Sequence, residues 1–74
     1  MVAHIRLSGS LRDLVQGLVE VEVAAGQTVR DAIQKIGLAP EIIAMVVVNE
    51  TQESKDYIIK DGDVVRLRAI IGGG

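Results

Sequence analysis

The feature that most constrains the fold is a strict alternation of apolar and charged residues in segment 18–23, LVEVEV. In an extended chain, Val19, Val21 and Val23 fall on one side, and Glu20 and Glu22 fall on the other. A period of two is typical of a β-strand with one buried face. We therefore predict a strand here, with its valines packed against a core.

Three further segments read as strands. Residues 2–7 (VAHIRL) and 64–71 (VVRLRAII) alternate in the same way, and residues 45–49 (MVVVN) form a short apolar run typical of a central strand. The turn sequence KDGD at residues 60–63 precedes the last strand. The residues expected to face the core from the first and last strands are Ala3, Ile5, Leu7, Val65, Leu67 and Ala69.

A single helix is predicted between these strands, over residues 28–36. Thr28 stands three residues before Asp31, which is a variant of the capping box, and Gly37 occupies the place of a left-handed C-terminal cap. Pro40 is suited to open a further short helical turn. The apolar residues that recur at helical spacing are Val29, Ala32, Ile33 and Ile36.

The order of these elements predicts an α+β fold. Terminal hairpins and one crossover helix give a mixed sheet of four to five strands, with the main helix packed across one face. Placing the last strand parallel to the first buries both in the middle of the sheet, which is the β-grasp arrangement. We expect one domain over residues 1–71 and a flexible glycine tail over residues 72–74.

Composition excludes several functional classes. The 74 residues carry a formal charge of −2 and no cysteine, so neither a basic nucleic-acid footprint nor a thiol-based site is expected. The start of the chain lacks the pattern of a signal peptide, and no apolar run is long enough to span a membrane. We expect a cytoplasmic protein without direct nucleic-acid or membrane contact.

The chain ends in Ile70, Ile71 and three glycines. Glycine has no Cβ, so such a peptide is thin and mobile and can enter a channel too narrow for side chains. Taken alone, the glycines are equally compatible with a cloning scar or a frayed terminus.

Several segments together give the chain a resemblance to the ThiS/MoaD family of sulfur carriers, ubiquitin-like β-grasp proteins that end in Gly-Gly. These are LRDL at residues 11–14, VEVEVAAGQTVRDAI at 19–33, VVVNE at 46–50 and KDGDVVRL at 60–67, followed by the terminal glycines. Two features depart from the pattern: Ile70-Ile71 stands where the molybdopterin branch usually carries prolines, and there are three glycines instead of two.

The resemblance implies a function as a substrate-like carrier and not as an enzyme. A ubiquitin-activating-like adenylyltransferase would use ATP and Mg²⁺ to adenylate the carboxylate of Gly74, with Gly72 and Gly73 bound in its channel. A sulfur derived from a persulfide would then replace AMP and leave a thiocarboxylate. A synthase would accept that sulfur, and the carrier itself would bind no cofactor.

The face of the last strand that points away from the helix is the expected docking surface for a partner. Alternation places both arginines of this strand there, just before the tail. A solvated strand face is the alternative interpretation. The residues expected at the interface are Arg66, Arg68, Ile70, Ile71 and one of Val46 or Val48.

The remaining polar residues indicate structure more than chemistry. His4 has no partners at the spacing of a metal site or a triad, so we expect it on the solvent side of its strand. Tyr57 is expected to anchor a loop, and Asp61 and Asp63 to form a turn and not a metal site.

Several functions stay open at this level. LRDL favours a molybdopterin-synthase small-subunit role, AAGQTV and the tail without prolines favour thiamine-thiazole synthesis, and tRNA thiolation is a third acceptor pathway. Alternatively, the terminal glycine is joined to lysines of target proteins, as in a ubiquitin-like modifier. A β-grasp binding module with an incidental tail would work without its glycines. An autonomous enzyme is disfavoured, because the sequence offers no acid–base pair, nucleophile or phosphate loop.

Overall fold

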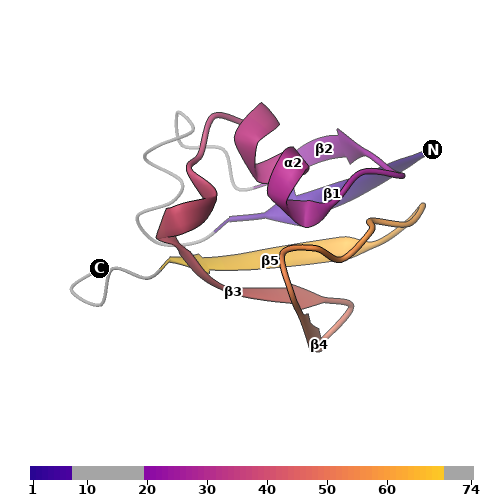
Figure 1. Cartoon of the computed structure of the whole chain (residues 1–74). Helices are drawn as coiled ribbons and strands as arrows, with labels where there is room; N and C mark the ends of the chain where they lie inside the picture. The colour runs from indigo at the N-terminus through magenta and orange to yellow at the C-terminus, as the bar shows by residue number, and fades with distance from the viewer. Residues whose placement is uncertain (8–19, 70–74) are drawn as a thin grey trace.

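The structure, a computed structural model, describes residues 1–7 and 20–69. In these ranges the strands form one mixed sheet in the order β2-β1-β5-β3-β4, and α2 lies across one face (Figure 1). The predicted β-grasp fold is confirmed. Residues 8–17, which lie between the first two predicted strands and read as a hairpin connection, and the tail at 72–74 are outside the described residues. The elements are β1 (Val2–Arg6), β2 (Glu20–Ala24), α2 (Val29–Lys35), the 3-10 turn η1 (Pro40–Ile42), β3 (Ile43–Val48), β4 (Thr51–Glu53) and β5 (Val64–Ala69).

The first and last strands pair in parallel at the centre of the sheet, as predicted. Ile5 of β1 lies beside Val65 of β5, and both side chains are fully buried. The His4 N–H donates to the carbonyl of Asp63 at 3.0 Å, which fixes the register where β5 begins. Each of these strands has a further antiparallel neighbour, β2 for β1 and β3 for β5.

The core lies between the sheet and α2 and is entirely aliphatic in the described residues. The predicted inward faces of β1 and β5 are confirmed, except that Ala69 is only partly buried. Burying a side chain of valine or isoleucine size contributes roughly 1.5–3 kcal/mol. The buried apolar residues are Ala3, Ile5, Leu7, Val23, Val29, Ala32, Ile33, Leu38, Ile43, Val46, Val48, Ile59, Val65 and Leu67.

The helix begins and ends where the sequence indicated. Thr28 is the N-cap, and its hydroxyl accepts a hydrogen bond from the Asp31 N–H at 3.1 Å. After Ile36, Gly37 adopts a φ of 94°, a left-handed conformation that a side chain would strain. Pro40 opens η1, as expected.

The segment after β3 differs from the sequence-based expectation. Residues 50–54 (ETQES) are polar and carry no strand pattern, so the sequence predicts a loop there, yet Thr51–Glu53 forms the edge strand β4 and pairs with β3. Asn49 and Glu50 turn the chain with φ values of 49° and 71°, as in a two-residue hairpin turn of type I′. Asparagine tolerates this conformation, but glutamate rarely adopts it, so the sequence carried only half of the hairpin signal.

The buried carboxylate of Asp63 fixes the loop before β5. It accepts hydrogen bonds from the Tyr57 hydroxyl at 2.9 Å, the Lys60 N–H at 2.9 Å and the Asn49 side-chain amide at 2.8 Å. Asp61 instead lies at the surface and accepts from the Val2 N–H at 3.0 Å. Both aspartates therefore have structural partners, and Tyr57 has the anchoring role predicted for it.

These contacts shift the pKa of two groups in the cluster. Burial alone raises the pKa of Asp63, but the hydrogen bonds from Lys60, Asn49 and Tyr57 outweigh it and hold the pKa below its usual value. The hydrogen bond that Tyr57 donates to Asp63 raises the pKa of the tyrosine hydroxyl. Both shifts favour a charged Asp63 that accepts from a neutral Tyr57.

We predict that Asp63→Asn lowers the free energy of unfolding by about 2 kcal/mol at neutral pH, because an amide NH₂ would face donors that now meet a carboxylate. Urea unfolding followed by circular dichroism measures this. Asp61→Asn is the matched control: it changes the exposed aspartate of the same turn and should have a smaller effect. Equal losses for both variants would contradict the assigned role of Asp63.

The lowered pKa of Asp63 also predicts how the stability difference between wild type and this variant depends on pH. Because the pKa of Asp63 is lower in the folded state, its stabilising contribution is fully present above its unfolded-state pKa of about 4. That contribution is lost as the pH falls through the folded-state pKa. The stability difference between wild type and Asp63→Asn should therefore shrink below about pH 4. A stability difference that stays constant down to the pH of acid unfolding would contradict the lowered pKa of Asp63.

Candidate functional site

The face of the sheet opposite α2, called the open face below, collects the charged residues of the central strands. The strand register sets Arg6 beside Arg66, and Arg66 beside Val47 of β3. One step further along, Arg68 lies beside Met45. A band of positive charge therefore crosses the middle of the open face, next to the half-buried apolar side chains of β3.

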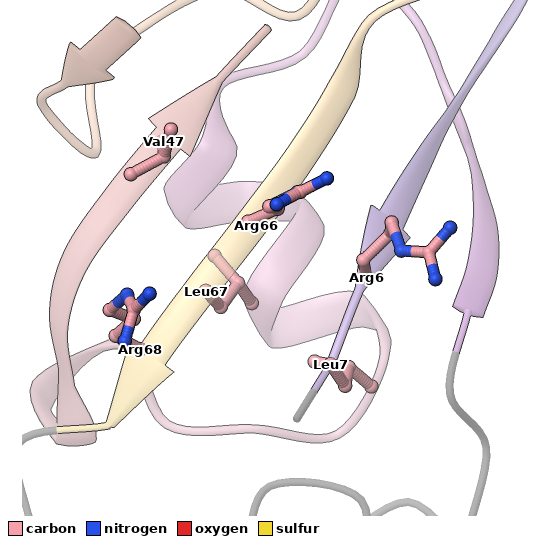
Figure 2. A pocket seen from close by; sticks show the side chains of 6 residues that line it. All are labelled: Arg6, Leu7, Val47, Arg66, Leu67 and Arg68. Carbon is pink, nitrogen blue, oxygen red and sulfur yellow. The ribbon is translucent and has the colours of Figure 1, made fainter. Parts of the chain in front are cut away.

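A hollow of about 390 Å³ opens beside the second half of β5, next to this band. Figure 2 shows guanidinium groups from both β1 and β5 around it. Because β5 ends at Ala69, the hollow lies near the strand end that residues 70–74 follow in the sequence. The lining residues are Arg6, Leu7, Val47, Arg66, Leu67 and Arg68.

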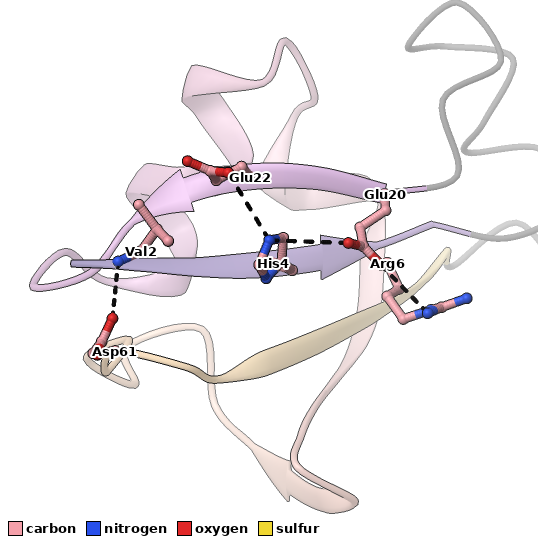
Figure 3. A network of polar contacts seen from close by, with 6 residues as sticks. All are labelled: Val2, His4, Arg6, Glu20, Glu22 and Asp61. Atoms are coloured by element: carbon pink, nitrogen blue, oxygen red, sulfur yellow. Dashed lines mark hydrogen bonds and ion pairs between the residues drawn. The ribbon is translucent and has the colours of Figure 1, made fainter.

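The β2 side of the open face is acidic. Glu20 forms an ion pair with Arg6 at 3.3 Å, and Glu20 and Glu22 each lie 4.0 Å from His4 Nε2 (Figure 3). These side chains are all substantially exposed, so each pair contributes little to stability. Charge therefore runs from acidic at β2 to basic at β5, with His4 on the solvent side as expected.

The predicted positions of Arg66 and Arg68 are confirmed, but those of Val46 and Val48 are wrong. Both valines point toward the helix and are 2% and 3% exposed, so neither offers apolar contact on the open face. Val47 does so instead. Three consecutive valines carry no alternation, so the sequence could not fix the facing of β3; the pairing of Val46 with Leu67 does.

The other predicted site residues lie outside the described part of the chain. These are Ile70, Ile71, Gly72, Gly73 and Gly74. Sequence reasoning did not assign Arg6 to the site, although its alternation with Ile5 and Leu7 already placed it on the outer face. In residues 1–7 and 20–69, no cluster of three or more histidines or carboxylates is arranged to hold a metal ion. No helix in the same ranges is long and apolar enough to cross a membrane.

The sheet order, the single helix in the described ranges and the parallel β1–β5 pair define a protein of the ubiquitin-like β-grasp class. The chain belongs to the ThiS family, whose model matches residues 5–74. The family match thus extends through the terminal glycines. A search of curated proteins gave no match.

Solved structures agree with this assignment. A Pyrococcus furiosus protein assigned as molybdopterin converting factor subunit 1 is 26% identical, with a TM-score of 0.71 over 90% of this chain and 94% of that one. SAMP1 from Haloferax volcanii is 20% identical, with a TM-score of 0.69 and full coverage of both chains. In a Helicobacter pylori complex of molybdopterin-converting factor subunits 1 and 2, the matched chain is 19% identical, with a TM-score of 0.66 and full coverage of both. The last two likenesses concern the fold alone.

The facing of β3 gives a direct test of the open face. Val46→Ala should lower the free energy of unfolding by roughly 2 kcal/mol, because it leaves a cavity in the core. Val47→Ala, its neighbour on the open face, should cost less than half as much. Urea unfolding of both variants measures the difference, and the reverse order of losses would show that β3 faces the other way.

Proposed function

We propose that this chain is a sulfur carrier whose C-terminal glycine is adenylated and then converted to a thiocarboxylate. One observation carries the proposal: the ThiS family match runs through Gly74. In support of it, the described domain ends at Ala69, beside an arginine-lined hollow, and the glycines follow in the sequence. Partner proteins would recognise the compact domain, and the terminal glycine would undergo the reactions.

The reaction requires an activating enzyme because a carboxylate is a poor acyl donor. A carboxylate oxygen of Gly74 attacks the α-phosphorus of ATP, and pyrophosphate leaves with its charge neutralised by Mg²⁺. A persulfide anion then attacks the acyl carbon, and AMP departs with the former carboxylate oxygen to leave an acyl disulfide. A thiol then attacks the outer sulfur of this acyl disulfide, which breaks its S–S bond, forms a new disulfide and releases the thiocarboxylate of Gly74. The α-carboxyl group, with a pKa of about 3.3–3.7, is ionised and ready for the first step at neutral pH. ATP and Mg²⁺ belong to the activating enzyme in this scheme.

The open face would dock the carrier on its partners. Arg66 and Arg68 are exposed and make no ion pair within the described residues, so they are available to carboxylates of another protein. Val47 and Met45 add apolar area at the same place. An interface formed by one face of so small a domain falls near the small end for specific complexes, which suits a carrier that must be released after transfer.

A synthase that accepts the sulfur is the second proposed partner. The similarity to molybdopterin converting factor subunit 1, at 26% identity, favours a role as the small subunit of a molybdopterin synthase. The Helicobacter pylori protein is solved together with its subunit 2, so a larger subunit is the kind of partner we expect. Thiazole synthesis and tRNA thiolation are the alternative acceptors.

The first test is the intact mass of the protein isolated from its native cells, under conditions that preserve thiocarboxylates. We expect a species heavier by the exchange of one oxygen for sulfur, located at Gly74. A variant lacking Gly73 and Gly74 should show no such species. An unmodified mass accompanied by larger, isopeptide-linked species would instead establish a protein modifier and overturn the carrier role.

The docking role of the open face is tested by reversing its charge. Arg66→Glu with Arg68→Glu should lower the thiocarboxylated fraction in cells at least tenfold while the domain stays folded. Arg30→Glu with Lys60→Glu makes the same charge change at two exposed positions on α2 and the loop before β5, and should have little effect. Equal losses in both double variants would mean that net charge, and not the open face, controls activation.

A further inference from the structure

A second surface lies at the β2 edge of the sheet, away from the arginines of β5. A groove of about 370 Å³ runs between this edge and the end of α2. Its floor is apolar and includes Val21, Val23 and Ile36, with Lys35 at its rim. In the described residues β2 pairs only with β1, so its outer edge has no partner strand there.

The backbone of β2 presents hydrogen-bonding groups along this edge. The His4 N–H is directed to β5, so the neighbouring residues Ala3 and Ile5 direct theirs to Val23 and Val21 of β2. By the same alternation, Glu20 and Glu22 point their N–H and C=O groups outward. The edge ends at Ala24, whose carbonyl accepts from Gln27 Nε2 at 2.9 Å. Gln27 Oε1 is buried in the groove wall and has no hydrogen-bond partner among the described residues.

The side chains of β2 specify what kind of strand fits beside it. On its inner side, β2 already pairs with a strand that alternates apolar and basic residues: His4 and Arg6 lie opposite Glu22 and Glu20 (Figure 3). The side chains of Glu20 and Glu22 are 42% and 64% exposed, respectively, so their carboxylates are also accessible from the outer side of β2. On the groove side, Lys35 would repel a basic residue.

We propose that the β2 edge binds an extended peptide segment of a partner protein in which apolar and basic residues alternate. The segment would add a strand to the sheet, placing its apolar side chains in the groove and its basic ones beside Glu20 and Glu22. A slip of one residue would bring the basic side chains to Lys35, so charge fixes the register. A second copy of this chain is disfavoured at the same edge, because it would set glutamates against glutamates.

The β2 edge and the arginine-lined hollow lie on different strands, so both partners can bind together. The carrier could hold an accepting or targeting protein at β2 while its tail occupies an enzyme bound to β5. This inference does not depend on thiocarboxylate formation, and its test uses the unmodified full chain.

The probe is a short acetylated and amidated peptide of alternating valine and lysine, titrated into nitrogen-15-labelled protein. We expect amide shifts that centre on residues 22–24 and 35–36, together with slowed hydrogen exchange at the Glu22 N–H. Raised salt should weaken binding. A matched peptide of alternating valine and glutamate should not bind.

Glu22→Lys should lower the affinity for the lysine peptide about three- to tenfold, since it turns a cross-strand attraction into a repulsion. Glu41→Lys makes the same change at an exposed position of η1 and should leave the affinity unaltered. Shifts scattered over acidic residues without protection of Glu22, equal binding of the glutamate peptide, or no binding would each overturn the proposal. Arg66→Glu should leave this binding intact, which separates it from docking at the open face.

Discussion

The parallel pairing of β1 with β5 is the interaction on which the rest of the structure depends. It joins the two ends of the described chain, placing Ile5 and Val65 at the centre of a sheet that α2 covers on one side only. Parallel strands are normally buried on both faces. Here, within residues 1–7 and 20–69, no second layer covers the other face of the pair, and that face carries His4, Arg6, Arg66 and Arg68. The pairing that stabilises the fold therefore also gathers the cations of the candidate site.

The same arrangement fits the carrier role proposed for this small domain. A chain of 74 residues has little interior to spare for a cleft. β5 is central in the sheet and last in the described order, so residues 70–74 follow in the sequence a strand that borders the open face. In the proposed function, recognition by the arginines and reaction at the terminal glycine would take place at two separate points of the chain. The β2 edge provides a further surface at the far side of the sheet.

Much of the fold could be predicted from the sequence, because β1 and β5 alternate strictly and the helix has explicit caps at Thr28 and Gly37. The facing of β3 could not be predicted, because its valine run has no period and the register with β5 shifts between Ile43 and Met45. The role of Asp63 was also out of reach, since its partners Asn49 and Tyr57 are brought to it only by the tertiary fold. The pairing of Val47 with Arg66 places Val47 on the open face, which the sequence alone did not determine.

Activation of the terminal carboxylate is measured most directly by exchange of labelled pyrophosphate into ATP. The assay uses an extract of the native cells depleted of this protein, supplied with ATP and Mg²⁺. If the chain is an adenylated carrier, adding the full-length protein raises the exchange rate, and adding the chain without Gly73 and Gly74 does not. An exchange rate that is unchanged by the full chain, or raised equally by the truncated one, would contradict adenylation at Gly74.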